Sequence, residues 1–231
     1  MHLIKDLPAY LYIIFTLSTL FAILLFFKAT GHSKQVLIII LLWLALQSVI
    51  SLSGFYTITK GLPPRFILLL LPPVIFIAAL FLTKKGRLAI DSYNAKALTM
   101  LHVVRIPVEL TLYWLFLYHT VPSIITFEGL NFDILCGLSA PVVYYFGYIK
   151  KVLGSKVIII WNVISLLLLA NVVVTAVLSA PFPFQQFGFE QPNTALLYFP
   201  FIWLPCCIVP VVFFAHLVCL RQCIGQLTKR S

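Results

Sequence analysis

The chain has 231 residues, of which 62% are hydrophobic and only 10% are charged. A soluble globular chain is about half apolar and about one quarter charged, so this composition excludes an ordinary soluble domain and indicates an integral membrane protein. The five cysteines include no C-x-x-C pair, so they imply no disulfide framework and no zinc finger. We interpret the net charge of +10 as mostly a determinant of membrane topology rather than a sign of a nucleic-acid partner.

Seven stretches are long and apolar enough to cross a bilayer, which takes about 20 residues. In chain order they are 7–27, 36–58, 66–82, 98–119, 130–149, 157–179 and 195–220. We expect helices, because a segment in lipid must satisfy its own backbone hydrogen bonds and none of these runs has the alternating pattern of a barrel strand. The predicted fold is all-α, with a single domain over residues 1–231 built as a bundle of seven transmembrane helices.

The segments that connect these helices alternate between two sides, and their basic residues are unevenly divided. One side holds three of them, Lys5, Lys60 and Arg65. The other side holds twelve, namely Lys28, Lys34, Lys84, Lys85, Arg87, Lys96, Lys150, Lys151, Lys156, Arg221, Lys229 and Arg230. Cytoplasmic loops carry the excess of Lys and Arg, so we expect the N-terminus outside and the C-terminus in the cytoplasm.

This charge bias also bears on the first helix and on the location of the protein. Cleavage of residues 1–27 as a signal peptide would place the basic loops outside, so we interpret the segment as a retained helix. The expected location is the plasma membrane, which is the inner membrane if the source is bacterial. Membrane lipid is the expected partner, and a protein partner is left open.

Three connections differ from the rest. The outer loops 120–131 and 180–194 contain no Lys or Arg and mix aromatic residues with Gly, Pro and one acidic residue each. Two interpretations are open: the loops fold back onto the helix ends and cap a cavity, or their aromatic residues are present only because aromatic side chains favour the membrane interface. On the cytoplasmic side the longest connection, 83–97, is short and at best amphipathic.

Polar and aromatic side chains recur at three- and four-residue steps in the fourth predicted helix, which places them on one face. They are His102, Arg105, Glu109, Tyr113 and Phe116. The opposite surface is aliphatic and suits lipid or apolar packing. The polar face must therefore point into the bundle.

Glu109 is the residue on this face that most needs an explanation. It lies eleven residues beyond Leu98, which is about 16 Å at 1.5 Å per residue and near the bilayer midplane. A carboxyl group there must be protonated, paired or exposed to a wet cavity, and Arg105 is four residues away, the spacing at which helical side chains meet. Either these groups mark a ligand, proton or ion pathway, or an Arg–Glu pair only locks the helix in place.

The segment 126–133, which leads into the fifth predicted helix, supplies three further acceptors. They are Glu128, Asn131 and Asp133. Their oxygens would suit a cation or a hydroxylated ligand, although capping of a local turn is the alternative, and the order of an EF-hand loop is absent. Asn131 and Asp133 also make 130–149 the weakest of the seven candidate spans.

His216, Cys219 and Cys223 share a face near the cytoplasmic end of the last helix, at a depth comparable with that of His102. Their ligand types would suit a metal ion, but cysteine is also a common packing residue in apolar surroundings, and we predict no metal site. Gln47, Ser51, Asn162 and Ser165 are expected to form hydrogen bonds between helices.

The leading functional hypothesis is a membrane protein with a polar cavity around the fourth helix that binds or transports a small solute, ion or lipid-like molecule. The predicted binding residues are His102, Arg105, Glu109, Tyr113, Glu128, Asn131 and Asp133. An intramembrane enzyme using His102, Glu109 and His216, with or without a metal, is the first alternative. A sensor or assembly subunit without chemistry of its own is the second. The sequence identifies no cofactor and no catalytic residue.

Overall fold

The computed structural model describes residues 3–4, 6–61 and 63–228, and this part of the chain is helical with no strand. The α-helices are α1 (Ala9–Ala29), α2 (Lys34–Leu52), α3 (Ile67–Leu82), α4 (Lys84–Asp91), α5 (Ala95–Leu101), α6 (Arg105–Leu117), α7 (Ile134–Val143), α8 (Ser155–Leu178) and α9 (Val209–Thr228). Short 3₁₀ turns cover Phe55–Thr57, His102–Val104, Ser123–Ile125 and Ala195–Leu197, and π-helical turns cover Tyr144–Ile149 and Leu204–Ile208. The expected all-α fold is confirmed.

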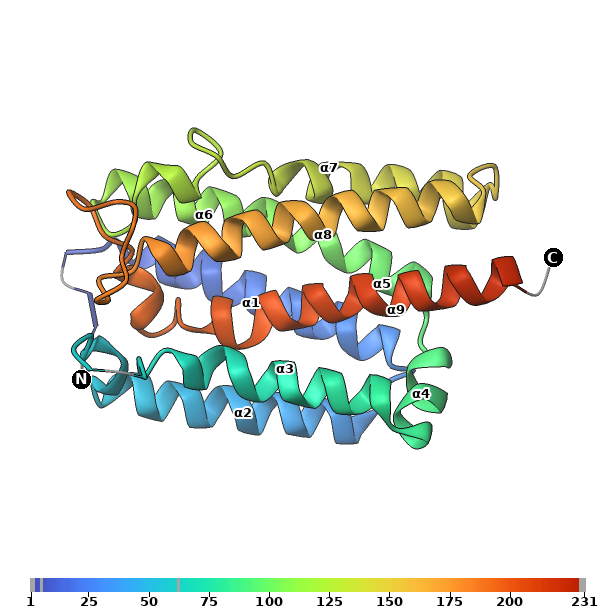
Figure 1. The fold of residues 1–231 in the computed structure, drawn as a ribbon, viewed down its shortest axis with the longest axis horizontal. Coiled ribbons are helices and arrows are strands. Elements are labelled where there is room, and N and C mark those ends of the chain that lie inside the picture. The colour runs from blue at the N-terminus through green and yellow to red at the C-terminus, as the bar shows by residue number, and fades with distance from the viewer. Residues whose placement is uncertain (1–2, 5, 62, 229–231) are drawn as a thin grey trace.

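The long helices lie side by side along one axis and form an elongated bundle (Figure 1). Helix α9 packs along α8 and α5, and α1 packs along α5 and α6. Helices α2 and α3 form one edge of the bundle, while α6, α7 and α8 lie at the opposite edge (Figure 1). The apolar core follows the contacts of α1, α5, α6 and α9, with Leu98, Leu101, Val104 and Leu115 fully buried.

Five helical segments of the described chain are long and apolar enough to cross a membrane. They are α1, α2, the continuous run Ala95–Leu117 through α5 and α6, α8, and the run Leu204–Thr228 that includes α9. A sixth is reached if α3 and α4 count as one span, and these two helices are bent by 92° where they meet. The helix Ile134–Ile149 is apolar but shorter. These segments indicate a membrane protein.

The structure corrects several predicted boundaries. The second helix ends at Leu52 rather than near residue 58, because Gly54 takes a left-handed conformation with φ of 79° and a 3₁₀ turn follows it. The last long helical run begins at Leu204 rather than at residue 195 and continues to Thr228. The connection 83–97 contains a true helix, α4, which begins where the Thr83 hydroxyl accepts a hydrogen bond from the Gly86 amide.

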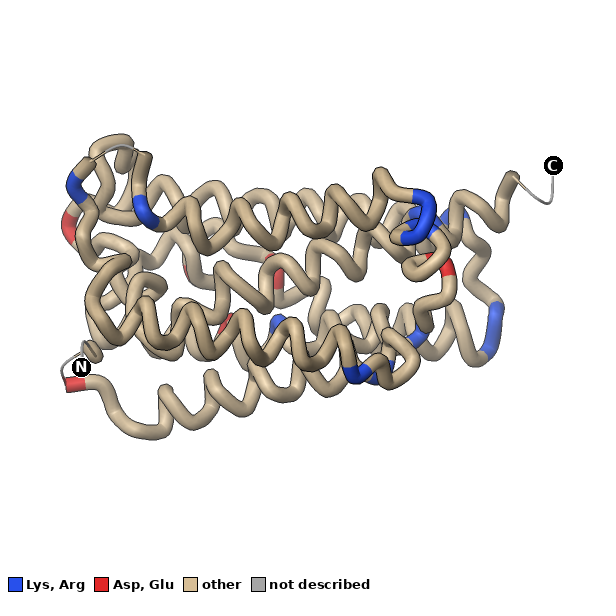
Figure 2. Tube along the Cα trace, turned by 90° about the horizontal axis from the view of Figure 1, so that it is seen from below, with Lys and Arg blue, Asp and Glu red and all other residues tan. Residues whose placement is uncertain are grey.

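Basic residues gather at one end of the bundle (Figure 2). At that end lie the α1–α2, α3–α5 and α7–α8 connections and the C-terminal part of α9, as Figure 1 shows. These parts of the chain carry Lys28, Lys34, Lys84, Lys85, Arg87, Lys96, Lys150, Lys151, Lys156 and Arg221. The opposite end carries Lys60 and Arg65, whereas Lys5, Lys229 and Arg230 lie outside the described residues.

Candidate functional site

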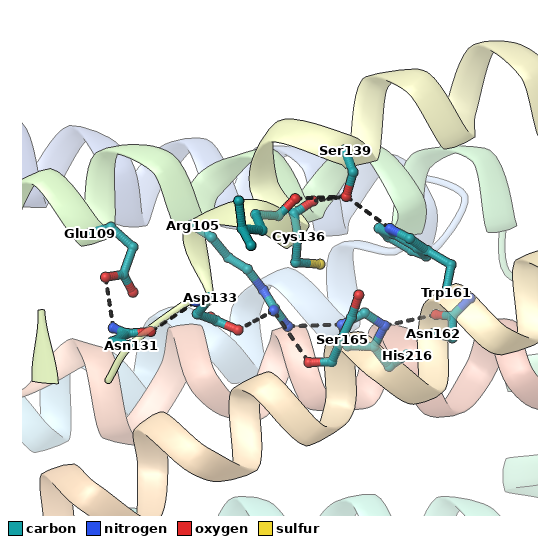
Figure 3. Close-up of polar contacts among 11 residues, drawn as sticks. Arg105, Glu109, Asn131, Asp133, Cys136, Ser139, Trp161, Asn162, Ser165 and His216 are labelled. Atoms are coloured by element: carbon teal, nitrogen blue, oxygen red, sulfur yellow. Dashed lines mark hydrogen bonds and ion pairs between the residues drawn. The ribbon is translucent and has the colours of Figure 1, made fainter. Parts of the chain in front are cut away.

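Arg105 lies at the middle of the bundle. The run Ala95–Leu117 has Ile106 as its middle residue, so Arg105 rather than Glu109 is nearest to half its length. His216 is the middle residue of the run Leu204–Thr228. These two residues are therefore at the same depth on two different helices, and Figure 3 shows their side chains pointing toward each other.

The guanidinium of Arg105 is buried, with 3% of the residue exposed, and it forms an ion pair with Asp133. The same Nη1 atom approaches the backbone oxygen of Ser165 on α8 at 3.5 Å. Among the described residues, Arg105 and Glu109 form neither a hydrogen bond nor an ion pair, so the expected pairing within the helix is wrong. Asp133 is the ion-pair partner of Arg105 instead, because its carboxylate lies beside the guanidinium.

His216 has a defined tautomer in this arrangement. Its Nε2 lies 2.8 Å from Nη2 of Arg105, and a guanidinium can only donate, so Nε2 must accept. Its Nδ1 lies 2.7 Å from Oδ1 of Asn162, whose amide nitrogen already donates to the Ile158 oxygen at 2.8 Å. The proton of His216 is therefore on Nδ1, the ring is neutral, and Asn162 fixes its orientation.

The segment that precedes α7 descends into the bundle and delivers two of the polar groups. Helix α7 begins part-way along the bundle rather than at its end (Figure 1). The Asn171 amide nitrogen holds the segment to α8 by donating to the Leu130 oxygen at 2.7 Å. Asp133 stands at the N-terminus of α7 but makes no capping bond with its side chain, since its carboxylate is engaged by Arg105.

Asn131 connects this segment to Glu109. Its amide nitrogen donates to Oε2 of Glu109 at 2.7 Å and to the Ile125 oxygen at 2.9 Å. Its Oδ1 accepts from the backbone amide of Asp133 at 2.9 Å. Asn131 is fully buried and Glu109 is 2% exposed. The polar contacts therefore run without a gap from Glu109 through Asn131, Asp133, Arg105 and His216 to Asn162 (Figure 3).

A glycine allows α7 to approach the arginine. A Cβ placed on Gly137 would meet Cγ1 of Ile106 at 2.9 Å, the Ile106 backbone nitrogen at 3.2 Å and Cβ of Arg105 at 3.3 Å. Only a residue without a side chain fits there. This close contact between α7 and the start of α6 brings Asp133 into reach of the guanidinium.

Two of the predicted binding residues lie apart from this network. Glu128 is exposed on the loop. The ring of Tyr113 packs against Phe127 in a tilted arrangement, with 4.8 Å between ring centres, and interacts with Glu128 rather than with Glu109. The segment 126–133 therefore does not bring Glu128, Asn131 and Asp133 together around a cation, because the last two turn inward and the first turns outward. The partners of Asn131 and Asp133 are protein groups.

A cavity of about 60 Å³ adjoins the network, which is room for a few water molecules. Its charged wall is formed by Arg105, Glu109 and Asp133. The other lining side chains are apolar and come mainly from α3, α6, α8 and α9. Nε of Arg105 is buried and has no hydrogen-bond partner among the described residues. Three charged side chains thus line one side of an otherwise apolar space.

The loops 120–131 and 180–194 are bonded to each other beside this cavity. The backbone amides of Thr194 and Ala195 donate to the Thr120 oxygen at 3.0 and 3.1 Å, and the Gln191 side chain donates to the Phe116 oxygen at 2.8 Å. Ile125 from the first loop and Leu196, just after the second, line the cavity itself. The loops fold back onto the helix ends, which is the first of the two interpretations that the sequence left open.

His102 forms a second cluster beside the network. Its ring stacks on His216 with 3.8 Å between ring centres and 15° between planes, and the edge of Trp161 lies 5.5 Å away. His102 is fully buried, and neither ring nitrogen has a hydrogen-bond partner among the described residues. His102, Cys136 and His216 bring possible ligand atoms to within 4.8 Å of one another.

This cluster differs from the grouping considered in the sequence. Cys219 does not join it, because its sulfur lies 4.0 Å from the Thr99 hydroxyl and from the Ala95 oxygen. Cys136 on α7 takes that place, and no pattern in the sequence singled it out. Asn162 was expected only to connect helices, and its function as the partner that orients His216 could not be foreseen because it depends on how α8 and α9 pack.

Comparison with known proteins supplies a family and no activity. Residues 62–224 match the family described as "Domain of unknown function (DUF8737)". The chain belongs to this family. The matched residues of the DUF8737 domain include every member of the network from Arg105 to His216 and stop within α9. No curated protein and no solved structure matches the chain.

Proposed function

We propose that this DUF8737 protein crosses the plasma membrane with seven helices, with its N-terminus outside and its C-terminus in the cytoplasm, and that its central cavity binds or moves a small solute or ion. In this arrangement α3 and Ile134–Ile149 complete the set of seven. The descending segment before α7 and the bend after α3 account for their short length. The excess of basic residues at one end marks the cytoplasmic side.

The observation that carries this proposal is the charged corner of the cavity. Arg105, Glu109 and Asp133 are buried at mid-depth and line a space that holds a few water molecules. Ionisable groups inside a membrane are expensive to keep, and in general they mark a pathway or a binding site. The Nε–H of Arg105 has no hydrogen-bond partner among the described residues, and an acceptor atom of a bound molecule would satisfy it. The small volume favours a small solute or ion over the lipid-like molecule that composition alone left open.

The test is whether a molecule accompanies the purified protein and depends on Glu109. Protein extracted from native membranes would be denatured and its small molecules measured by mass spectrometry, for wild type, Glu109→Gln and Glu128→Gln. The second variant removes the same charge from an exposed loop position. We expect a stoichiometric molecule in wild type and Glu128→Gln and at least a tenfold loss in Glu109→Gln.

Folding must be separated from binding in this comparison. Each variant is first examined by size-exclusion chromatography and thermal unfolding, and only samples that elute as wild type does are analysed. If folded Glu109→Gln retains the same molecule in the same amount, or if no preparation contains one, the network is a structural lock and the proposal fails.

The cluster of His102, Cys136 and His216 supports a second candidate, an intramembrane enzyme that uses a metal ion. Two imidazoles and a thiol suit a borderline or soft ion such as Zn²⁺ or Cu⁺. The fit is incomplete, because nearly parallel stacked rings do not direct their lone pairs at one point, and Nε2 of His216 already accepts from Arg105. An ion would require rotation of the His102 ring and displacement of the guanidinium.

Metal analysis of the purified protein distinguishes this candidate from the first. The metal-dependent candidate predicts about one transition-metal ion per chain, lost in both His102→Ala and Cys136→Ala and retained in Cys223→Ala, whose sulfur lies outside the cluster. The solute-binding proposal predicts no such ion. A metal content that is unchanged by His102→Ala would remove the cluster as its site.

A further inference from the structure

A second and larger hollow lies between α2 and α3, away from the polar network. Its volume is about 320 Å³, and its walls are formed by residues such as Val36 and Trp43 of α2 and Pro72 and Leu80 of α3. Its floor is the π-helical turn Leu204–Ile208 and the start of α9. The indole of Trp43 anchors α2 to this floor by donating to the Cys206 oxygen at 2.9 Å. We call this hollow the α2–α3 groove.

The length of the groove corresponds to one leaflet of a bilayer. Val36 and Trp43 are seven residues apart on α2, which is about 11 Å along a helix. Pro72 and Leu80 are eight residues apart on α3, or about 12 Å. The hydrocarbon of one leaflet is about 15 Å deep. The lining is apolar apart from the Trp43 indole and the Tyr93 hydroxyl, so the groove suits an acyl chain and not a polar solute.

One end of the α2–α3 groove, which we call its mouth, lies near Val36 and Leu80 at the basic end of the bundle. Lys34 begins α2 two residues before Val36, and Lys84 begins α4 four residues after Leu80. Lys34, Lys84 and Lys85 are all exposed. The described acidic residue at this end, Asp91, is held by Arg221 through two bonds of 2.7 and 2.8 Å. The mouth of the groove is therefore positively charged.

Helix α4 follows α3 at this end of the bundle and has the features of a membrane-surface helix. It is bent by 92° from α3, so it lies across the bundle axis while α3 runs along it. Its Ile90 is buried against the protein, its lysines are exposed, and Leu88 is 73% exposed. A short helix with basic and exposed apolar side chains, turned into the plane of the interface, is typical of contact with anionic lipid.

We infer that the α2–α3 groove binds one acyl chain of an anionic glycerophospholipid, whose phosphate is held by Lys34, Lys84 and Lys85. The occupant follows from the combination of an apolar channel one leaflet deep with three cations at its mouth, which no soluble metabolite and no uncharged lipid matches equally well. The inference rests on the membrane embedding proposed above but does not depend on the central cavity.

The test is native mass spectrometry of the full chain released from nanodiscs that contain equal amounts of phosphatidylglycerol and phosphatidylcholine. We expect one retained phosphatidylglycerol per chain. The combined change Lys34→Gln, Lys84→Gln and Lys85→Gln should lower its retained fraction at least tenfold. The control combines Lys150→Gln, Lys151→Gln and Lys156→Gln, which removes the same charge at the same end but in the α7–α8 connection and the first turn of α8. It should change retention less than twofold.

A second pair of variants tests the channel itself. Ile40→Trp fills the groove, whereas Leu42→Trp adds the same bulk to a lipid-facing position of α2 outside it. Retention should fall at least tenfold only in the first. Equal retention of both lipids, equal loss in both lysine combinations, or retention unchanged by Ile40→Trp would each overturn the inference.

The outcome is separable from that of the proposed function. The lysine and Ile40 variants should leave the molecule of the central cavity in place, and Glu109→Gln should leave phosphatidylglycerol bound. Both proposals require that the protein is embedded in the membrane. Release of the protein from membranes by alkaline carbonate would therefore overturn both.

Discussion

Arg105 organises the site through the shape of its side chain. A guanidinium presents its donors as a planar fork. Nη1 of Arg105 donates to Asp133, and Nη2 donates to His216 on α9. A lysine ammonium carries all its donors on one nitrogen and lacks this fork, so it could not meet both partners at their present positions. The position therefore needs arginine for geometry as well as for charge.

Removal of either member of the ion pair should destabilise the protein strongly. Asp133→Asn leaves the Arg105 guanidinium buried without a countercharge, and Arg105→Met leaves Asp133 in the same position, so each should cost about 3–5 kcal/mol. The double variant removes both charges and should cost clearly less than the sum of the two. Thermal unfolding in one detergent gives the three values. Additive losses would show that the two residues do not interact as described.

The sequence indicated which side chains form the candidate site better than it indicated which of them pair with each other. His102, Arg105, Glu109, Asn131 and Asp133 were all selected, because charged and amide side chains are conspicuous in apolar helices. The pairs that these residues form were not predicted. Spacing along one helix favours Glu109 as the partner of Arg105, whereas Asp133 is 28 residues away and is brought to Arg105 only by the tertiary fold.

Among the helices, the contact between α6 and α7 determines the geometry of the site. Gly137 permits this contact, and the descending segment before α7 uses the resulting space to place Asn131 and Asp133 at mid-depth. The site is therefore built by the close approach of two helices rather than by one polar face.

A methyl group at Gly137 should disturb this contact. Gly137→Ala places a Cβ 2.9 Å from Cγ1 of Ile106 and 3.2 Å from its backbone nitrogen, so α7 must shift away from Arg105. We expect a loss of about 1–3 kcal/mol in the free energy of unfolding. The matched control is Gly225→Ala in α9, where a Cβ meets nothing within 4 Å, and it should be neutral or stabilise by up to about 1 kcal/mol. Equal effects of the two changes would contradict the proposed contact.

The existence of the helices was predictable, and their ends and breaks were not. Long apolar runs identify helices because lipid leaves the backbone few alternatives. The 3₁₀ turn His102–Val104, the late start of α7 at Ile134 and the surface helix α4 escaped prediction. Each depends on what the segment packs against, and hydropathy along the chain does not report that.

For the whole molecule, the uneven distribution of charge predicts the orientation in the membrane. The described residues place ten basic side chains at one end of the bundle and two at the other, and the excess belongs in the cytoplasm. A fluorescent protein fused to the C-terminus should therefore be fluorescent, and alkaline phosphatase inserted after Gln185, in the loop before α9, should be active. An inactive phosphatase at that loop together with an active one at the C-terminus would reverse the proposed topology.

The whole fold combines an end closed by the loops 120–131 and 180–194, an opposite end rich in basic residues, and a charged cavity between them. The decisive measurement is an electron cryo-microscopy structure of the protein in native lipid, at a resolution that separates water from side chains, for wild type and Glu109→Gln. We predict non-protein density in the cavity within hydrogen-bond distance of Arg105 Nε and Glu109, lost or displaced in the variant. A cavity closed by protein side chains alone, with the same network in both structures, would contradict the account and leave the charges as a structural lock.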